Sequence, residues 1–361
     1  MDHERFMRRA LELASSVPRT SPNPHVGAVV ERDDEIVGEG WHRGAGTPHA
    51  EVEALAAAGD AARAATLYVN LEPCIHHGRT PPCVPAIVEA GIKRVVAAIE
   101  DPDQRVTGAG FDALRERGIE VVTGVMADEA RAVNRSFLHE RATGRPLVTL
   151  KLAFTLDGRL SAPDGSSRWI TGEEARAFVH RRRAEVDAVM VGAGTVLKDD
   201  PELTSRLGPV ERQPARIVVD GRGRVPATAK VFADGDVVVA TTDASPHETQ
   251  LAWKESGAEV LHLGEKVGRV DLDGLLRVIA ERGWLEVYCE GGADLATSLL
   301  RDKLVDRLEI IHGAVMIGSG GAAIGELGLT SMPDAHGFVL VRLERFGDDV
   351  LTIYEPKEGR S

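Results

Sequence analysis

The hydrophobic and polar positions of this chain alternate between helix-like and strand-like periods from one end to the other. Residues 2–16 repeat apolar side chains at helical spacing, which predicts an amphipathic helix. After it, the pattern predicts strands over 25–41, 65–73, 94–101 and 119–125, and helices over 49–59, 84–92, 110–118 and 127–143. Regular alternation of strands and helices is typical of α/β architecture.

The stretch TGRP interrupts this alternation. Gly144 and Pro146 are helix stop signals directly behind a predicted helix, so we expect a first domain over 1–145 and a second over 146–361. A chain of 361 residues is long enough for two hydrophobic cores. The second half is again α/β, with strands predicted near 147–155, 187–192, 215–220, 236–241, 258–262, 285–290, 304–312 and 338–355.

Composition limits the possible classes of function. The net charge is −13 and the basic residues are dispersed among acidic ones, so we expect no nucleic-acid partner. No apolar run approaches the roughly 18–20 residues that cross a bilayer, and MDHERFMRRALELASS lacks the apolar core of a signal peptide. Three cysteines in such a chain fit a reducing compartment. We therefore expect a cytoplasmic protein without a membrane partner.

The stretch LEPCIHHGRTPPC carries two of the cysteines, Cys74 and Cys83. Upstream, TPHAEVEAL places His49 and Glu51 in the first turn of a predicted helix. One imidazole and two thiolates make a three-ligand zinc shell that leaves a fourth position for water. Glu51 is two residues from a ligand, so it can exchange protons with that water without binding the metal. The pattern indicates a hydrolytic zinc site with Glu51 as its acid–base catalyst.

The residues alone leave other interpretations of this stretch open. A disulfide between the cysteines is disfavoured in a reducing compartment. A structural zinc would take His76 or His77 as a fourth ligand, but it would leave Glu51 without a role. The triplet HAE by itself is also an ordinary helix start with a favourably placed glutamate. H-x-E followed by P-C-x-x-C is the signature of zinc nucleobase deaminases, although here the second cysteine follows nine positions after the first.

The motifs EPCIHHGRTPPC, TSPNPHVGAVV and GEGWHRGAGTPHAEVEAL, with NRSFLHERATGRPLVTLKLAFTLDGRLS, resemble the bifunctional riboflavin-biosynthesis deaminase–reductases. The resemblance covers nearly the whole chain. It implies a cytidine-deaminase-like three-layer domain followed by a dihydrofolate-reductase-like domain, with zinc and NADPH as cofactors. The implied activity is deamination of a diamino-ribosylamino-pyrimidinone 5′-phosphate, followed by reduction of its ribosyl group to a ribityl chain. It also implies a homo-oligomer that assembles through the reductase domain.

The resemblance further implies that His49, Cys74 and Cys83 bind zinc, that Glu51 moves protons, and that substrate contacts come from Asn23 and His42. On pattern alone, Asn23 in SPNP is equally well explained as a turn residue, and His42 as a surface histidine.

One stretch departs from the family pattern, which usually has DPNP where this chain has DPDQ, residues 101–104. Asp103 replaces a hydrogen-bond donor by a charged acceptor. The substrate contact of this stretch, including Gln104, therefore stays open.

The second half contains no full G-x-G-x-x-G fingerprint, because MVGAGTVLKDD has Leu197 at the third glycine position. CEGGAD is a better phosphate cradle, although glycines between a strand and a helix often only make the turn. The resemblance implies cofactor contacts from Ala153, Trp169, Thr195, Asp199, Gly221, Gly292, Ala293, Asp294, Leu295, Ala296, Thr297 and Ser298. It implies substrate contacts from Ser167, Arg183, Leu203, Arg206 and Glu290.

The run HRRR is the one basic cluster of the chain. The planar guanidinium of Arg183 suits a ribose phosphate, whereas we expect Arg181 and Arg182 on a solvated helix face. Lys151 is either a polar contact in the reductive site or a buried stem, and Cys289 is most simply a core residue of a strand. No basic residue is placed securely enough to choose NADPH over NADH.

Three functional interpretations follow. The leading one is a bifunctional enzyme for consecutive deamination and reduction of phosphorylated pyrimidines. A second is a chain in which only one half is active. A third is a zinc-stabilised binding protein for pyrimidine nucleotides or RNA, against which the acidic charge and Glu51 argue. Metal analysis together with an assay of ammonia release separates these interpretations, because a binding protein releases no ammonia.

Overall fold

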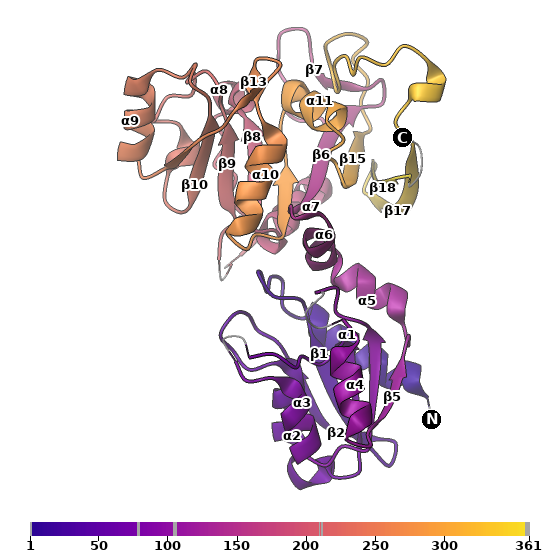
Figure 1. The fold of residues 1–361 in the computed structure, drawn as a ribbon. Helices are drawn as coiled ribbons and strands as arrows, with labels where there is room; N and C mark the ends of the chain where they lie inside the picture. The colour runs from indigo at the N-terminus through magenta and orange to yellow at the C-terminus, as the bar shows by residue number, and fades with distance from the viewer. Residues whose placement is uncertain (1, 78–79, 104–106, 209, 211, 358–361) are drawn as a thin grey trace. The chain divides into compact units, whose positions relative to one another are not determined.

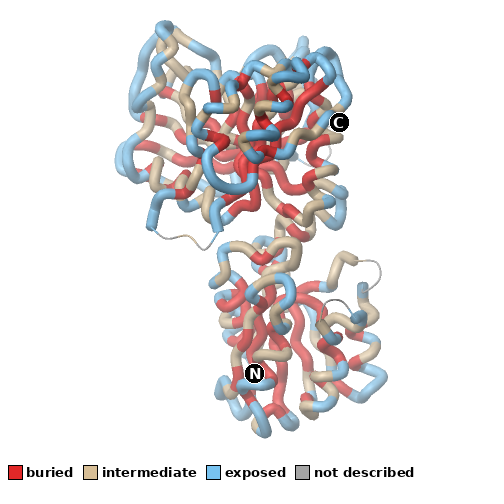
Figure 2. The backbone as a smooth tube through the Cα atoms, turned by 90° about the vertical axis from the view of Figure 1, so that its left-hand side faces the viewer, coloured by how far each residue is buried: buried red, intermediate tan, exposed pale blue. Residues whose placement is uncertain are grey.

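The structure is a computed structural model that describes residues 2–77, 80–103, 107–208, 210 and 212–357. The chain divides into two compact units, Met1–Gly144 and Arg145–Ser361, each built around one large β-sheet (Figure 1). In both units the central strands are buried, and most of the exposed positions lie in helices and loops (Figure 2). Among the described residues, none of the helices combines the length and the apolar content needed to span a membrane.

The first unit is an α/β/α sandwich. Its elements are α1 (His3–Ser15), β1 (Gly27–Arg32), β2 (Glu35–Trp41), α2 (Ala50–Ala58), β3 (Thr66–Leu71), α3 (Cys83–Glu89), β4 (Arg94–Ile99), α4 (Ala109–Glu116), β5 (Glu120–Thr123), α5 (Ala127–Val133) and α6 (Arg135–Thr143). The sheet has the order β2-β1-β3-β4-β5, in which β3, β4 and β5 are parallel. Helices α1 and α5 pack together on one face, and α2, α3 and α4 form a second layer. The three parallel strands therefore end at the same edge of the sheet.

The segment 25–41, which the sequence predicts as one strand, is a hairpin of β1 and β2. Asp33 and Asp34 turn the chain with φ angles of 54° and 66°. Two consecutive residues with positive φ make the tight turn whose twist matches that of the flanking strands, and aspartate tolerates this conformation. The prediction missed the turn because no glycine marks it.

The helix predicted over 127–143 is broken into α5 and α6 at Asn134, whose φ is −101° and whose ψ is 18°. The side chain of Asn134 accepts a hydrogen bond from the backbone N–H of His25 at 2.8 Å and donates one to its carbonyl oxygen at 3.0 Å. These bonds tie the break to the loop before β1, so a partner distant in sequence ends the helix.

The second unit is a nine-stranded α/β sheet. Its elements are β6 (Leu147–Thr155), β7 (Arg159–Ser161), α7 (Glu173–Glu185), β8 (Ala188–Gly192), α8 (Ala193–Asp199), β9 (Ala215–Val219), β10 (Val237–Thr241), α9 (His247–Glu255), β11 (Glu259–His262), β12 (Glu265–Lys266), β13 (Arg269–Val270), α10 (Leu272–Glu281), β14 (Glu286–Cys289), α11 (Ala293–Arg301), β15 (Arg307–Gly313), β16 (Gly321–Ala322), β17 (Phe338–Phe346) and β18 (Asp349–Pro356). The sheet order is β11-β10-β9-β8-β14-β6-β15-β18-β17, and the strands from β11 to β15 are parallel.

Two hydrophobic cores cover the two faces of this sheet. Successive strand residues point to opposite faces, so Val189 belongs to the core that contains α7, α8 and α9, and Met190 to the core that contains α10 and α11. Both residues are fully buried. Burial on both faces explains why these parallel strands are almost continuous runs of apolar residues.

The segment 338–355, predicted as a single strand, is a hairpin that turns at Gly347 with a φ of 60°. Its outer strand, β17, is at the edge of the sheet. Several apolar side chains of β17 are exposed, namely Val339, Leu340, Val341 and Leu343. Apolar side chains on a strand at the open edge of a sheet are unusual for a surface that stays in water.

The start of the second unit is held by an ion pair. The guanidinium of Arg145 donates two hydrogen bonds of 2.7 Å to the carboxylate of Asp306, which also accepts the backbone N–H of Val148 at 2.9 Å. Immediately before it, Gly144 ends α6 in the left-handed conformation, with its N–H bonded to the carbonyl oxygen of Glu140. The chain thus passes from a helix cap of the first unit directly into an anchored residue of the second.

Two candidate catalytic sites

Helix α2 approaches strand β2 closely because Gly38 and Gly40 have no side chains. A Cβ at Gly40 would lie 2.2 Å from the backbone oxygen of Ala50, and one at Gly38 would meet the same helix at 2.3 Å. Glycine is required where two backbones come this close. The contact fixes the start of α2, where His49 is the N-cap and Glu51 lies in the first turn.

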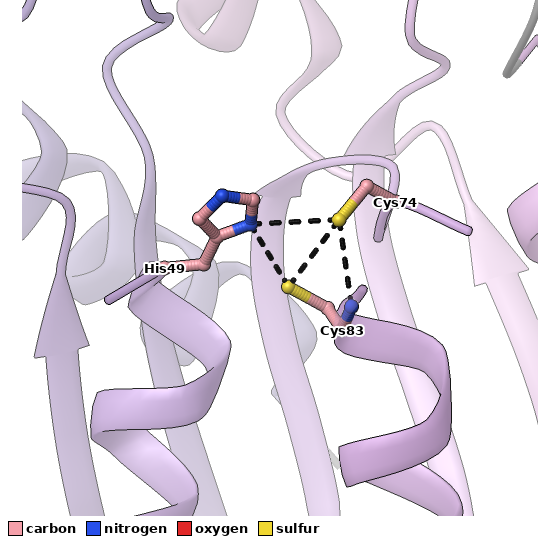
Figure 3. Close-up of side chains that lie close together, drawn as sticks. All are labelled: His49, Cys74 and Cys83. Atoms are coloured by element: carbon pink, nitrogen blue, oxygen red, sulfur yellow. Dashed lines mark hydrogen bonds between the residues drawn. The ribbon is translucent and has the colours of Figure 1, made fainter. Parts of the chain in front are cut away.

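Three of the side chains singled out from the sequence meet beside this helix start. His49 Nδ1 lies 3.1 Å from Cys83 Sγ and 3.5 Å from Cys74 Sγ, and the two sulfurs are 3.6 Å apart. Figure 3 shows His49 at the start of one helix, Cys83 at the start of another, and Cys74 on a neighbouring loop. The three potential ligand atoms all lie within 4.8 Å of one another. An imidazole nitrogen and two sulfurs at this separation suit zinc.

The electrostatics of the cluster favour metal binding and proton transfer. The hydrogen bond with Cys83 lowers the pKa of Cys74 to about 4, and the same contact, with burial, raises the pKa of Cys83. One of the two sulfurs is therefore held as a thiolate, the form that binds metals. Burial raises the pKa of Glu51, and the negative charge of Cys74 raises it further. Glu51 is 4% exposed, so its carboxyl group is largely shielded from solvent.

Asn23 and His42 lie beside the cluster and contact each other. Asn23 Nδ2 is 2.8 Å from His42 Nε2, and His42 Nδ1 is 3.1 Å from the carbonyl oxygen of Pro48. Because a carbonyl oxygen only accepts, Nδ1 of His42 carries the proton, and Nε2 accepts from the Asn23 amide. Burial lowers the pKa of His42, which favours this neutral form. Its ring packs edge-on against His49 at 5.5 Å between centroids.

The other residues singled out near the cluster lie apart from it. His76 and His77 are exposed, and within the described part of the chain the cluster contains only His49 and the two cysteines. The backbone carbonyl oxygen of Asp103 accepts hydrogen bonds from the N–H and the hydroxyl of Thr107, whereas Gln104 is outside the described residues. The geometry therefore offers three candidate protein ligands for a metal.

Glu72 is a residue near this site that the sequence did not single out. Its buried carboxylate accepts four backbone N–H groups, from Asp101, Gly108, Gly110 and Phe111, at 2.8–3.3 Å. The carboxylate ties the end of β3 to the loop that follows β4. No local sequence pattern predicts that Glu72 accepts these hydrogen bonds, because all four donors are distant from it in sequence.

In the second unit, the predicted cofactor residues gather where the sheet reverses its direction of winding. From β8 the chain continues through α8 toward β9, whereas from β14 it continues through α11 past β6 to β15. Helices α8 and α11 lie on opposite faces of the sheet. Ligands of open α/β sheets bind outside the carboxyl ends of the strands at such a switch point. Thr195 of α8 bridges it, since its hydroxyl oxygen accepts the N–H of Gly292 at 3.0 Å.

The remaining cofactor candidates lie around the same edge of the sheet. Ala153 is near the carboxyl end of β6, and Gly221 follows β9, with its carbonyl oxygen bonded to the Thr242 hydroxyl. Trp169 is 66% exposed, with the Arg176 guanidinium 4.3 Å from its ring centroid.

Asp199 ends α8, and its carbonyl oxygen accepts a hydrogen bond from Arg168. Residues 293–298 form the first turns of α11, where Leu295, Ala296, Thr297 and Ser298 are buried. The structure thus brings Thr195 and Gly292 into contact and places the other candidates on neighbouring elements of this edge.

The substrate candidates differ in how they are held. Arg183 donates two hydrogen bonds to the Glu290 carboxylate at 2.6 and 2.9 Å, and a third to the carbonyl oxygen of Thr204 at 3.0 Å. Arg206 is mostly exposed, and among the residues that the structure describes its guanidinium pairs with the carboxylate of Glu202 at 3.6 Å. Much of Arg183 is thus occupied within the protein, whereas Arg206 faces solvent.

Leu203 and Ser167 complete the predicted substrate set. Leu203 is buried and has a φ of 59°, which is uncommon for a residue with a branched side chain. Ser167 lies on the loop before α7 and is half-buried.

The loop that carries Leu203 and Arg206 is clamped by two residues that the sequence did not single out. The side chain of Gln213 accepts from the N–H of Ser205 at 2.8 Å and donates to its carbonyl oxygen at 3.0 Å. His180 Nδ1 is 3.2 Å from the carbonyl oxygen of Thr204. Polar residues on separate elements therefore fix the loop beside Arg183.

The expectation that Arg182 lies on a solvated helix face is wrong. Its side chain is 16% exposed and forms ion pairs with Glu185, Glu286 and Glu309. Two of these carboxylates come from strands of the sheet. Contacts distant in sequence therefore bury the guanidinium of Arg182, which the helical pattern predicts to be exposed.

Lys151 and Cys289 occupy strands next to the reductive site. Burial lowers the pKa of Lys151, while the charge of Glu290 opposes that shift. Cys289 is fully buried in β14, in keeping with a core role.

Comparison with known families covers both units. The cytidine and deoxycytidylate deaminase zinc-binding region matches residues 1–99, and the RibD C-terminal domain matches residues 146–352. The chain is 42% identical over 351 residues to the riboflavin biosynthesis protein RibD of Aquifex aeolicus, across 97% of each chain. It is 40% identical over 365 residues to RibD of Escherichia coli, covering 97% of this chain and 98% of that protein.

Two solved structures are similar over nearly the full length. Acinetobacter baumannii RibD superposes with a TM-score of 0.89 at 37% identity and covers 99% of both chains. The deaminase/reductase from Thermotoga maritima has a TM-score of 0.87 at 37% identity, covering 98% of this chain and 99% of that one.

Proposed function

This chain belongs to the RibD family of bifunctional deaminase–reductases of riboflavin biosynthesis, and from that premise we propose which residues carry out its two reactions. The Thermotoga maritima relative is a diaminohydroxyphosphoribosylaminopyrimidine deaminase and 5-amino-6-(5-phosphoribosylamino)uracil reductase. We assign the deamination of that diaminopyrimidine to the first unit, Met1–Gly144, and the reduction of its ribosyl group to the second, Arg145–Ser361.

For the deamination, His49, Cys74 and Cys83 would hold zinc. Zinc, when bound, supplies the Lewis acidity that makes water a nucleophile near neutral pH. Glu51 takes the proton of the attacking water and returns it to the departing amine, so that ammonia leaves and a carbonyl remains. Its position two residues from His49, in a buried helix start, supports this role. Asn23 and His42, bonded to each other beside the cluster, orient the pyrimidine ring.

For the reduction, NADPH supplies the hydride when bound. The switch point at Thr195 and Gly292 offers backbone and hydroxyl groups for its phosphates, with Ala153, Trp169, Asp199, Gly221 and residues 293–298 as further contacts. Arg206 binds the substrate phosphate, while Arg183 and Glu290 contact the substrate as an ion pair. Ser167 and Leu203 line the same site. The preference for NADPH over NADH is part of this proposal.

The observation that carries the proposal is the convergence of the three ligand atoms within 4.8 Å, next to buried Glu51. The test is a coupled assay on the purified chain that follows ammonia release and NADPH oxidation from one diamino substrate. Cys83→Ala should abolish bound zinc and ammonia release, because two protein ligands hold zinc poorly. It should still oxidise NADPH when supplied with deaminated substrate.

Cys289→Ala is the matched control, because Cys289 is a buried cysteine of the second unit and lies outside the cluster. It should keep both zinc and ammonia release. A Cys83→Ala variant that still releases ammonia would remove the zinc site from the reaction.

We also propose that the chain forms a homo-oligomer through its second unit and works in the cytoplasm. The exposed apolar residues of edge strand β17 support self-association, since a second copy can pair with that edge. The reduced cysteines of the zinc site favour a reducing compartment. Sedimentation equilibrium that finds only monomers would contradict the first of these points, and oxidised cysteines in protein from its native cells would contradict the second.

A further inference from the structure

The segment between the two cysteines contributes one more side chain to the cluster. Thr80 Oγ1 lies 2.8 Å from Nε2 of His49. The other ring nitrogen of His49, Nδ1, is the one that faces the sulfurs of Cys74 and Cys83, at 3.5 and 3.1 Å. Thr80 therefore contacts the ligand histidine on the side away from the two sulfurs.

The chemistry of imidazole gives this contact a meaning. A metal binds the lone pair of one ring nitrogen, so the other nitrogen of a neutral ligand histidine carries the proton and needs an acceptor. A threonine hydroxyl can accept that proton's hydrogen bond. Partners of this kind fix the tautomer and the ring orientation of metal-binding histidines.

The helix itself does not orient the ring. His49 is the N-cap of α2 in an extended conformation, and its side chain makes no capping hydrogen bond to the helix. Within the described part of the chain, the ring nitrogens make polar contacts to the two sulfurs and to Thr80. Of these, Thr80 alone is not a predicted ligand, so its contact is available whether or not the sulfurs are engaged with a metal.

We propose that Thr80 is a positioning residue of the metal site, which accepts the Nε2–H of His49 and thereby directs Nδ1 toward the metal. The inference rests on the proposed zinc site. It also explains the long spacing between the cysteines, because Thr80 lies three residues before Cys83 in the segment that joins them. The return is held by the N–H groups of Cys83 and Val84, which both donate to the carbonyl oxygen of Cys74.

The test compares zinc affinity in Thr80→Val, Thr80→Ser and the unmodified chain, by competition with a chromophoric chelator. Valine keeps the shape but removes the hydroxyl, so zinc should bind about 10–100-fold more weakly. Serine keeps the hydroxyl and should restore an affinity close to that of the unmodified chain. Thr107→Val is the matched control: in the described part of the chain its hydroxyl bonds to the backbone of its own loop, so zinc affinity should not change.

A second measurement needs no variant. Nitrogen-15 NMR of the histidines in the zinc-loaded chain should show the His49 proton on Nε2. A proton on Nδ1, or a Thr80→Val variant that binds zinc as tightly as the unmodified chain, would overturn the role of Thr80 while leaving the zinc site standing. An unmodified chain that takes up no zinc would overturn both. Equal weakening by valine and serine would also overturn it, since packing and not the hydroxyl would then be responsible.

Discussion

The two sites of this chain are prepared for their ligands in different ways. In the first unit, His49, Cys74 and Cys83 direct one nitrogen and two sulfurs toward one another within 4.8 Å. In the second, Arg183 and Glu290 are already joined by two hydrogen bonds. In the first site, three potential metal-binding atoms lie close together. In the second, a positive and a negative side chain pair with each other.

The difference shows which property determines what each site binds. Thiolates and imidazole select a soft, tetrahedral metal by their chemistry, so the ligands alone define the first site. In the second unit, Arg183 and Glu290 lie largely out of solvent, and buried charges are tolerated only when paired. Substitutions should therefore affect chemistry in the first site, whereas substitutions of the buried Arg183–Glu290 pair should affect stability in the second.

The largest effect is expected for Glu51→Gln. The amide cannot move protons, so ammonia release should fall by about 10²–10⁴-fold while zinc content stays unchanged. Reduction of deaminated substrate should continue at its original rate. Glu53→Gln is the matched control from the same helix turn, where Glu53 pairs with Arg43, and it should release ammonia normally. Equal turnover by Glu51→Gln would remove its catalytic role.

The next effect is on stability. Glu290→Gln leaves the buried guanidinium of Arg183 without a counter-charge, which should lower the free energy of unfolding by about 3 kcal/mol. Urea unfolding measures it. Glu202→Gln breaks a pair in which both side chains are largely exposed, and it should cost less than about 1 kcal/mol. If the two variants unfold alike, the pairing of the second site is not what holds it together.

A smaller effect is expected on binding. Arg206→Ala removes an exposed guanidinium, so the KM for the phosphorylated substrate should rise about tenfold, the value of one charge-assisted hydrogen bond. The KM for NADPH and the urea midpoint should not change. Arg212→Ala, another exposed arginine of this unit, is the control. An unaltered substrate KM in Arg206→Ala would place the phosphate elsewhere.

The smallest effect is expected from acidification. Burial alone would raise the pKa of Glu290, but Arg183, with Lys151 and His180, lowers that pKa below its usual range. The folded pKa is then below the unfolded one, so the stabilisation is present above about pH 4.3 and disappears as the pH falls. Urea midpoints of the native chain and of Glu290→Gln should therefore converge on acidification. A constant difference between them would show that the charge of Glu290 is not involved.

The sequence predicted the alternation of elements well because apolar periodicity is set by local burial on a sheet. It failed where a turn or a break depends on something else. The hairpin at Asp33 and Asp34 depends on two positive φ angles without glycine, and the break at Asn134 depends on hydrogen bonds to His25. Neither signal is contained in the hydrophobic pattern.

The candidate sites show the same limit. The side chains of cysteine and histidine indicate metal chemistry, so the three candidate ligands could be named from the sequence, and the structure brings their atoms together. Glu72 and Gln213 act by gathering backbone groups that only the fold brings near. Arg182 was misjudged because two of its carboxylate partners, Glu286 and Glu309, lie on strands far along the chain.

The ion pair between Arg145 and Asp306 indicates at which peptide bond the chain should be divided to produce its two halves as separate fragments. A reductase fragment that begins at Pro146 would lose both hydrogen bonds to the Asp306 carboxylate. A fragment that begins at Arg145 keeps them, and a deaminase fragment that ends at Gly144 keeps the residue that caps α6. The peptide bond between Gly144 and Arg145 is therefore the point at which each half retains its own terminal contacts.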